Sequence, residues 1–151
     1  MKQYSFNKVD LIIDGEKVTG FANSNNIITA ARSVNAHASI MDAKGNMNVA
    51  TSADLSGIIS FNLLHTSDTN QVLQARAILD QSLGLADNGA VFVPWHAIIQ
   101  DKMGSTLVAA TTGFIPKVPN ISRGNGFTVH NWNILFEQIH WPVTGTYTNT
   151  L

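Results

Sequence analysis

The feature of this sequence that most constrains its fold is a long alternation of side chains from Phe127 to Trp141. Successive side chains of a β-strand point to opposite faces, so a strand here would sort these residues into two sets. One face would carry Thr128, His130, Trp132, Ile134 and Phe136, and the other Val129, Asn131, Asn133, Leu135 and Glu137. The first set contains large apolar side chains, so the pattern predicts a strand with one buried face inside a sheet.

A tight hairpin is predicted near the start of the sequence. Val9, Leu11 and Ile13 alternate with Asp10 and Asp14, and Asp14-Gly15 precedes a second run, Lys17 to Phe21. Asp-Gly between two such runs is a strong hairpin signal. Further strands are predicted from Ile27 to Ala31, Ile58 to Leu64, Ala90 to Ile99 and Leu107 to Ile115.

One helix is predicted in the middle of the chain. The segment from Ser67 to Asn70 offers N-cap side chains, and Gly84 is the predicted end. Between them, apolar residues fall on one face at helical spacing: Val72, Ala75, Leu79 and Leu83. This stripe is narrow, so we expect the helix to lie on the outside of a sheet. The length of 151 residues suits a single domain over residues 1–151, mostly antiparallel β with one helix.

The segment from residue 33 to residue 52 has no clear period. Asp42 to Gly45 is typical of a turn, so we expect a long protruding loop or hairpin. Its apolar residues are too few and too irregular to fold alone, and we expect a neighbouring subunit to cover them. The candidate inter-subunit contact residues are Val34, Ile40, Met41, Asp42, Lys44, Met47 and Val49.

The composition favours a protein that is buried against other protein. Charged residues make up 13% of the chain, about half of the roughly 25% typical of soluble domains. Their place is taken by 15 Asn, 11 Ser and 13 Thr, and interface cores are likewise depleted in charge. A weakly charged monomer is the alternative. The net charge is −1, so the chain has no excess of basic residues that would bind nucleic acid.

The residue pattern offers no catalytic, cofactor or metal site. The five histidines are His37, His65, His96, His130 and His140, whose nearest pair is ten residues apart, whereas zinc sites usually contain close pairs. We interpret them as surface or interface residues. Without cysteine there is no thiol nucleophile or disulfide, and no Gly-x-Ser-x-Gly elbow is present. No signal segment or run of ~20 apolar residues is found, so we expect a protein made in the cytoplasm, with no membrane partner.

The stretch from Asn46 to Leu73, NMNVATSADLSGIISFNLLHTSDTNQVL, resembles the tail tube proteins of contractile-tailed bacteriophages. The matching elements are Gly45 with Met47, Ser52-Ala53-Asp54-Leu55-Ser56-Gly57, the strand from Ile58 to Leu64, Thr66-Ser67 and Asn70. The opening YSFNKVDLIIDGEKVTGFA is similar to the first hairpin of that family, and the closing strand with Asn131-Trp132 is similar too. The polar tail, residues 142–151, has no match in the resemblance.

The resemblance implies a β-sandwich or split β-barrel, mostly antiparallel, with one flanking α-helix. It also implies a structural virion protein, not an enzyme, that forms hexameric rings stacked into a hollow tube inside a contractile sheath. The implied partners are the sheath, baseplate and tape-measure proteins, with DNA passing through unbound and no cofactor. Such a protein would be assembled in the host cytoplasm and reside in the virion tail. With the polar strand faces toward the channel, the lumen-facing residues would be Ser60, Asn62, Asn131 and Asn133.

The sequence leaves two groups of alternative functions open. One is still structural: the tube of an R-type bacteriocin or of a type VI-like secretion system, or a tail completion protein. The other is a small β-barrel module that binds a sugar or an apolar ligand. Its stacking surface would be formed by Trp95, Trp132 and Trp141, although aromatic residues at strand positions are more often part of a core.

Overall fold

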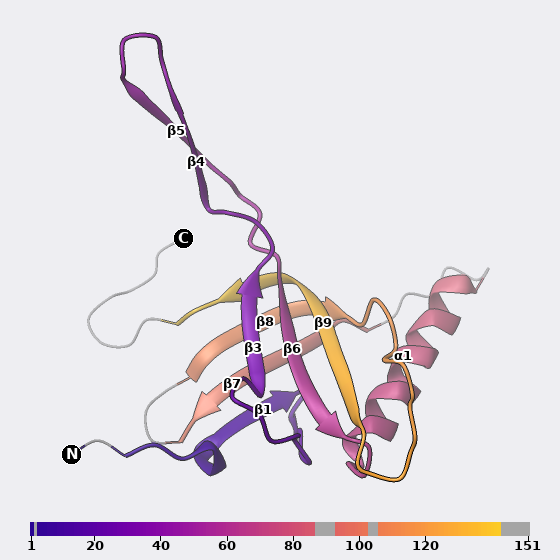
Figure 1. Cartoon of the computed structure of the whole chain (residues 1–151). Helices are drawn as coiled ribbons and strands as arrows, with labels where there is room; N and C mark the ends of the chain where they lie inside the picture. The colour runs from indigo at the N-terminus through magenta and orange to yellow at the C-terminus, as the bar shows by residue number, and fades with distance from the viewer. Residues whose placement is uncertain (2, 87–92, 103–105, 143–151) are drawn as a thin grey trace.

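A seven-stranded antiparallel sheet forms the body of the protein in a computed structural model (Figure 1). The structure describes residues 1, 3–86, 93–102 and 106–142. The order of strands across the sheet is β2-β1-β7-β8-β9-β6-β3, and β4 and β5 form a separate two-stranded sheet. The elements are η1 (Phe6–Lys8, a 3-10 helix), β1 (Val9–Ile13), β2 (Glu16–Lys17), β3 (Ile28–Arg32), β4 (His37–Met41), β5 (Met47–Thr51), β6 (Gly57–Leu64), α1 (Thr69–Leu85), β7 (Trp95–Asp101), β8 (Thr106–Phe114) and β9 (Val129–His140).

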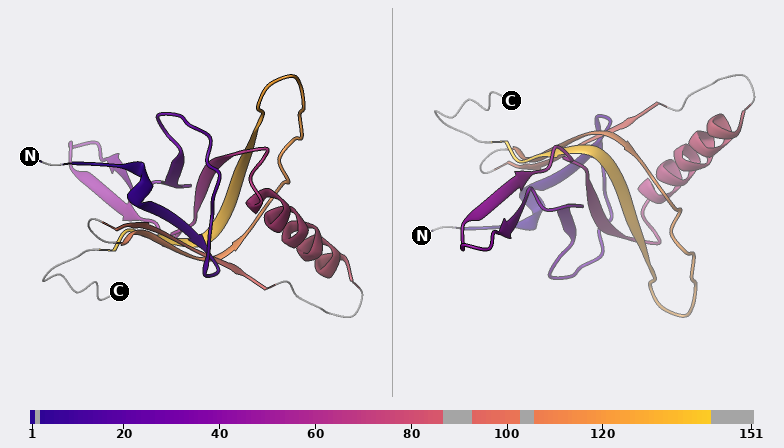
Figure 2. Two further views of the ribbon diagram at one scale, coloured as in Figure 1. Left: turned by 90° about the horizontal axis from the view of Figure 1, so that it is seen from below. Right: turned by 90° about the horizontal axis from the view of Figure 1, so that it is seen from above.

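The sheet is strongly curved (Figure 2), and the core side chains lie on one of its faces. The two edge strands, β2 and β3, do not pair with each other, so the sheet is sandwich-like and is not closed into a barrel. The predicted fold class, mainly β and mostly antiparallel with one helix, is confirmed. The largest fully buried side chains are Trp95, Trp132, Phe61, Phe136, Leu11, Ile59, Leu63, Ile134 and Ile139.

The predicted hairpin at Asp14-Gly15 is confirmed. Ile13 pairs with Glu16, and both turn residues have positive φ, 51° for Asp14 and 85° for Gly15. Two left-handed residues in succession form the type I′ turn, whose twist matches that of the flanking strands. The turn places the carboxylate of Asp14 beside β7, where it accepts a hydrogen bond of 2.8 Å from the backbone N–H of His96.

The predicted alternation in β9 is confirmed for most of its length. His130, Trp132, Ile134 and Phe136 are all buried. Beyond Phe136 the buried position shifts to Ile139, beside the part of β8 where Thr112 has a φ of 57°. The predicted strand from Ala90 to Ile99 begins at Trp95 within the described residues, and its first three positions lie outside them.

The prediction of which helix face is buried was wrong. Val72 and Leu79 are 52% and 57% exposed, and the buried residues of α1 are Asn70 and Leu73. The inward face of the helix carries polar side chains, Asn70 and Asp80, that hydrogen-bond to core tryptophans. The spacing of apolar residues does not reveal such a face. The helix also runs to Leu85, so Gly84 lies inside it and does not end it.

Of the polar tail predicted from residue 142 to residue 151, only Pro142 belongs to the part of the chain that the structure describes. The rest of that segment lies outside the described residues. No helix in the described part of the chain is long and apolar enough to cross a membrane.

Candidate assembly surfaces

The hairpin formed by β4 and β5 projects away from the body of the protein (Figure 1). All ten of its strand residues are exposed, including Ile40 at 71% and Met47 at 62%. Pairing places Met41 opposite Met47 and Ser39 opposite Val49. The structure therefore gathers the predicted contact residues on one projecting arm, with Asp42 and Lys44 in its tip and Val34 at its base.

The tip of this hairpin is held by the carboxylate of Asp42. One of its oxygens accepts hydrogen bonds of 2.9 Å from the backbone N–H groups of Lys44 and Asn46. These bonds favour the charged carboxylate and lower the pKa of Asp42. Gly45 supplies the left-handed residue, with a φ of 85°, that a three-residue hairpin loop needs. The arm thus has a well-defined end although no other element of the described residues covers it.

The Ser52–Gly57 motif joins the hairpin to β6 through successive side-chain turns. The hydroxyl of Ser52 accepts from the backbone N–H of Asp54 at 3.1 Å, and the Asp54 carboxylate accepts from that of Ser56 at 2.9 Å. At Gly57, a Cβ atom would lie 2.5 Å from the carbonyl oxygen of Ala31. The residues that carry the family resemblance here therefore shape the base of the hairpin.

The four residues predicted to face the lumen form one polar patch on the outer face of β6 and β9. Ser60 pairs with Asn133 and Asn62 with Asn131, so they occupy two adjacent rows. The hydroxyl of Ser60 donates to Oδ1 of Asn133 at 2.7 Å. The patch shares this face with the apolar residues Ile58, Leu64, Val129 and Leu135. Along both strands the only charged residue is Glu137, so the face is almost free of charge.

Helix α1 lies on the opposite side of the sheet from this patch. The side chain of Asn70 accepts from the indole N–H of buried Trp132 at 2.9 Å and donates to the carbonyl of Leu64 at 2.8 Å. Asp80 accepts from the indole N–H of Trp95 at 2.7 Å. Since both tryptophans point into the core, these bonds fix the helix on the core side and leave the patch on the other face.

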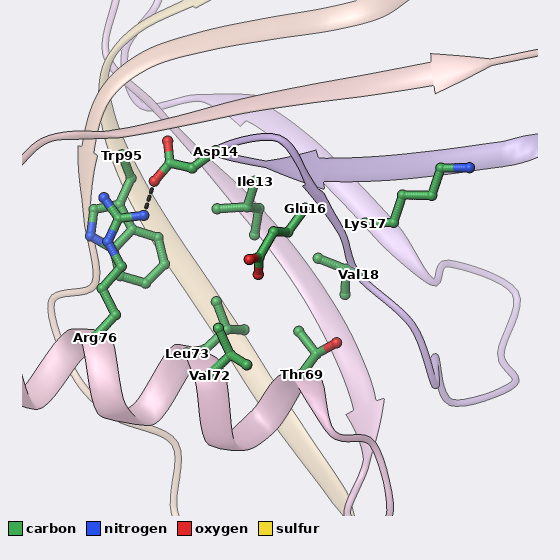
Figure 3. Close-up of a pocket in the computed structure, with 10 residues that line it drawn as sticks. All are labelled: Ile13, Asp14, Glu16, Lys17, Val18, Thr69, Val72, Leu73, Arg76 and Trp95. Carbon is green, nitrogen blue, oxygen red and sulfur yellow. Dashed lines mark ion pairs between the residues drawn. The ribbon is translucent and has the colours of Figure 1, made fainter.

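A cavity of about 210 Å³ lies between α1 and the β1–β2 hairpin (Figure 3). Arg76 lies at one end of it, ion-paired with Asp14 and 4.3 Å from the ring centroid of Trp95. Burial lowers the pKa of Arg76, and the negative charge of Asp80 opposes that effect. The charge of Arg76 is already satisfied within the chain, so we interpret this cluster as an anchor for the helix and not as a ligand site.

The aromatic stacking surface of the ligand-binding hypothesis is not formed. Trp95 and Trp132 are fully buried, and Trp141 is 42% exposed. The ring of Trp141 instead faces the guanidinium of Arg32, with 5.2 Å between Cζ of Arg32 and the ring centroid. That guanidinium also donates to the carbonyl of Ile139 at 3.0 Å, which ties β3 to the end of β9.

Within the described residues, no three His, Asp or Glu side chains are grouped so that they could hold a metal ion. The histidines have other contacts. His37 lies 3.0 Å from the hydroxyl of Thr51, and Nδ1 of His65 accepts from the backbone N–H of Thr128 at 3.1 Å. The interpretation of all five as surface or interface residues is wrong for His130, which lies in the core and is 2% exposed.

His130 should make the stability of the fold depend on pH. Burial, Arg123 and His65 lower its pKa, so the folded chain takes up this proton only at a lower pH than the unfolded chain does. In the unfolded chain it takes up a proton near pH 6.5. Stability should therefore be complete above that pH and fall as the pH drops below it. Thermal unfolding at pH 7.5 and pH 5 should show a smaller pH effect for His130→Gln than for the wild type. An unchanged pH effect would contradict this, and His37→Gln is the exposed control.

Three solved structures with a similar fold come from contractile injection systems. The anti-feeding prophage cap, which terminates that particle's tube, matches with a TM-score of 0.54 at 12% identity over 95% of both chains. The sheath/tube terminator of the extracellular contractile injection system PVC, in its extended state, matches with a TM-score of 0.55 at 11% identity. That match covers 95% of this chain and 99% of the other. A chain of the PVC sheath–tube complex in the extended state also has a TM-score of 0.55 at 11% identity, over 91% and 89% of the two chains.

The fold is thus shared with a class of proteins found in contractile injection systems, among them parts of the structures that terminate the tube. Within that class, the family model of the bacteriophage PhiTE tail tube protein matches residues 1–143. The chain belongs to this tail tube family, so the resemblance seen in the sequence is confirmed. It is a tail tube-type structural protein and a component of a phage-type tail, not an enzyme. The curated proteins contain no match.

Proposed function

We propose that this protein forms hexameric rings that stack into the inner tail tube of a contractile-tailed phage, and that the tube is the conduit for DNA ejection. The observation that carries the proposal is the nearly uncharged outer face of β6 and β9, with its patch of Ser60, Asn62, Asn131 and Asn133, on the side of the sheet away from α1. A channel wall of this kind offers phosphate groups no cations to bind, so DNA can slide along it. Such a tube would assemble in the host cytoplasm and remain in the virion tail.

The two sides of the subunit suit the two sides of a tube wall. Strands β8, β9, β6 and β3 are neighbours in the sheet, and their outer face would line the channel. Four strands from each of six copies, ~4.8 Å apart, give a backbone circle about 37 Å across, which leaves room for a duplex. Helix α1 would then face outward, toward the sheath protein. The baseplate and tape-measure proteins would meet the tube at its end and in its channel.

Purified protein should assemble into rings and tubes as its concentration rises. Head-to-tail contacts between identical subunits close into rings when the rotation between them permits it. Negative-stain microscopy should show rings or tubes, and light scattering should report particles much larger than one chain of 16.3 kDa. Monomers at every concentration and salt tested would refute the proposal.

The lumen assignment can be tested by placing a cation in the channel. Tubes of the wild-type protein should not bind a short DNA duplex at low salt. Tubes of Asn133→Lys should bind it, lose it as salt is added, and protect it from DNase, because the DNA lies inside the tube. Gln71→Lys, on the helix side, is the matched control and should give no protection. Protection by the control variant, or none by Asn133→Lys, would show that the polar patch does not line the channel.

A tube terminator is the second candidate function, because two of the matched structures are terminators. A terminator would form single rings that do not stack. Tubes many rings long, seen in the same micrographs, would exclude this role. Tubes of bacteriocin or secretion type are expected to give similar micrographs, and the genes beside this one would separate them from a phage tail.

A further inference from the structure

The loop that joins β8 to β9, residues 115–128, protrudes from the body of the protein (Figure 2). From residue 116 to residue 127, every hydrogen bond to another described part of the chain comes from the side chain of Arg123. Nη1 of Arg123 lies 3.3 Å from Nε2 of His130 and 3.4 Å from the hydroxyl of Thr128. This stretch of the loop is therefore tied to the body at one side chain.

Two histidines of the body accept hydrogen bonds from the loop. The guanidinium of Arg123 can only donate, so Nε2 of His130 must be unprotonated where the two meet. Nδ1 of His65 accepts from the backbone N–H of Thr128 at 3.1 Å, so this nitrogen must be unprotonated too. A charged imidazole carries a proton on both nitrogens and has no acceptor left. Both contacts therefore require a neutral histidine.

The packing of the core does not explain why a histidine stands at position 130. His130 is 2% exposed, and because its Nε2 is the acceptor, the proton of the neutral ring lies on Nδ1. That nitrogen is buried and has no hydrogen-bond partner among the described residues. A buried donor without a partner costs free energy, which an apolar side chain at this position would avoid. The contact with Arg123 is what the histidine provides instead.

The surroundings of His130 oppose its protonation while the loop is in place. Burial lowers its pKa most, and the charges of Arg123 and His65 lower it further. Within the described residues, no salt bridge to a carboxylate neutralises Arg123. A proton on His130 would therefore set two positive charges in contact, and Arg123 would have to withdraw.

We propose that His130 and His65 form a pH-sensitive switch, which holds the loop against the body while both are neutral and releases it when they are protonated. Once the loop is released, His130 takes up a proton near the usual pKa of histidine, about 6.5. The released state thus binds more protons than the held state, so the loop is held above that pH and released below it. The ratio of released to held loops changes by about tenfold per pH unit for each proton taken up.

The distance between two spin labels tests the switch. The chain contains no cysteine, so labels attach only where cysteine is introduced. Asn125→Cys lies in the loop and Gln71→Cys on α1, and both positions are exposed. In dilute, unassembled protein we expect one narrow distance distribution at pH 7.5 and a broad one at pH 5. A distribution that stays narrow at pH 5 would overturn the proposal.

Variants of the cluster identify the groups that act. His130→Gln and His65→Asn replace the ring acceptors by amide oxygens that do not take up a proton in this pH range. The double variant should keep the narrow distribution at pH 5, whereas Arg123→Ala should broaden it already at pH 7.5. His37→Gln, at an exposed histidine, is the matched control and should behave like the wild type. Broadening of the double variant at pH 5, or a narrow distribution for Arg123→Ala at pH 7.5, would show that these contacts do not hold the loop.

A second pair of labels separates release of the loop from unfolding of the body. Gln71→Cys with Asn131→Cys joins α1 to the outer face of β9, and its distance distribution should stay narrow at pH 5. Equal broadening of both pairs would mean that the whole body unfolds, and no local switch would exist. The switch lies within one subunit and goes beyond the proposed tube, so a failure to form rings or tubes would count against the proposed function alone.

Discussion

Replacement of Asn70 by leucine should lower the free energy of unfolding by about 1–3 kcal/mol. The side chain of Asn70 is 4% exposed and hydrogen-bonds to two groups, the buried indole N–H of Trp132 and the carbonyl of Leu64. A buried polar group that loses its partner costs about 1–3 kcal/mol, and leucine would leave the indole N–H of Trp132 without one, whereas the carbonyl of Leu64 keeps the backbone N–H of Ser67 at 3.0 Å. Urea unfolding followed by the fluorescence of the tryptophans measures the loss.

The interaction with Trp132 can be separated from the rest by a double-mutant cycle. Trp132→Phe removes the indole N–H, so Asn70→Leu should cost about 1–3 kcal/mol less in that background. Gln71→Leu, at the exposed neighbouring position, is the control and should change stability by less than about 0.5 kcal/mol. Equal costs of Asn70→Leu in the two backgrounds would mean that the indole hydrogen bond does not stabilise the fold.

The same glycine-to-alanine change should have opposite effects at Gly57 and Gly84. At Gly57 the new Cβ would lie 2.5 Å from the carbonyl oxygen of Ala31 and 2.6 Å from Cδ1 of Ile139. The carbonyl belongs to the paired strand β3, so it cannot move without loss of pairing, and we expect a loss of about 1–3 kcal/mol. At Gly84, inside α1, no atom lies within 4 Å, and alanine should stabilise the helix by about 0.5–1 kcal/mol.

Thermal unfolding of the two variants beside the wild type checks this pair. The melting temperature should fall for Gly57→Ala and rise for Gly84→Ala, by about 2–4 °C for each kcal/mol in a chain of this size. A fall of similar size in both variants would indicate that glycine serves a conformational role at both sites, and would contradict the steric explanation for Gly57.

The strands could be predicted from the sequence because their information is local. The alternation in β9 and the Asp14-Gly15 turn depend only on neighbouring residues, and both are confirmed. The register between β6 and β9 is not local. It places Ser60 beside Asn133 and Asn62 beside Asn131, so the sequence could propose these four residues but could not show that they adjoin.

The helix shows where such reasoning fails. The apolar spacing along the helix indicates Val72 and Leu79, which are exposed, and does not indicate Asn70, which is buried. Asn70 can enter the core because Trp132 and Leu64 satisfy its amide, and that pairing spans distant parts of the chain. A polar residue in a core is recognised only when its partners are known. The family resemblance had included Asn70 without a reason, and the structure supplies one.

The hairpin leaves the body of the subunit on one side only, and this has a consequence for growth (Figure 1). If successive copies join through it, a growing stack has a direction. One end presents free hairpins, and the other presents the surfaces that would bind the hairpins of the next copies. A copy with a defective hairpin would still bind at the end that presents hairpins, but the next copy could not bind to it. Such a variant would act as a dominant-negative, and a small fraction of it mixed with normal copies would shorten every stack it entered.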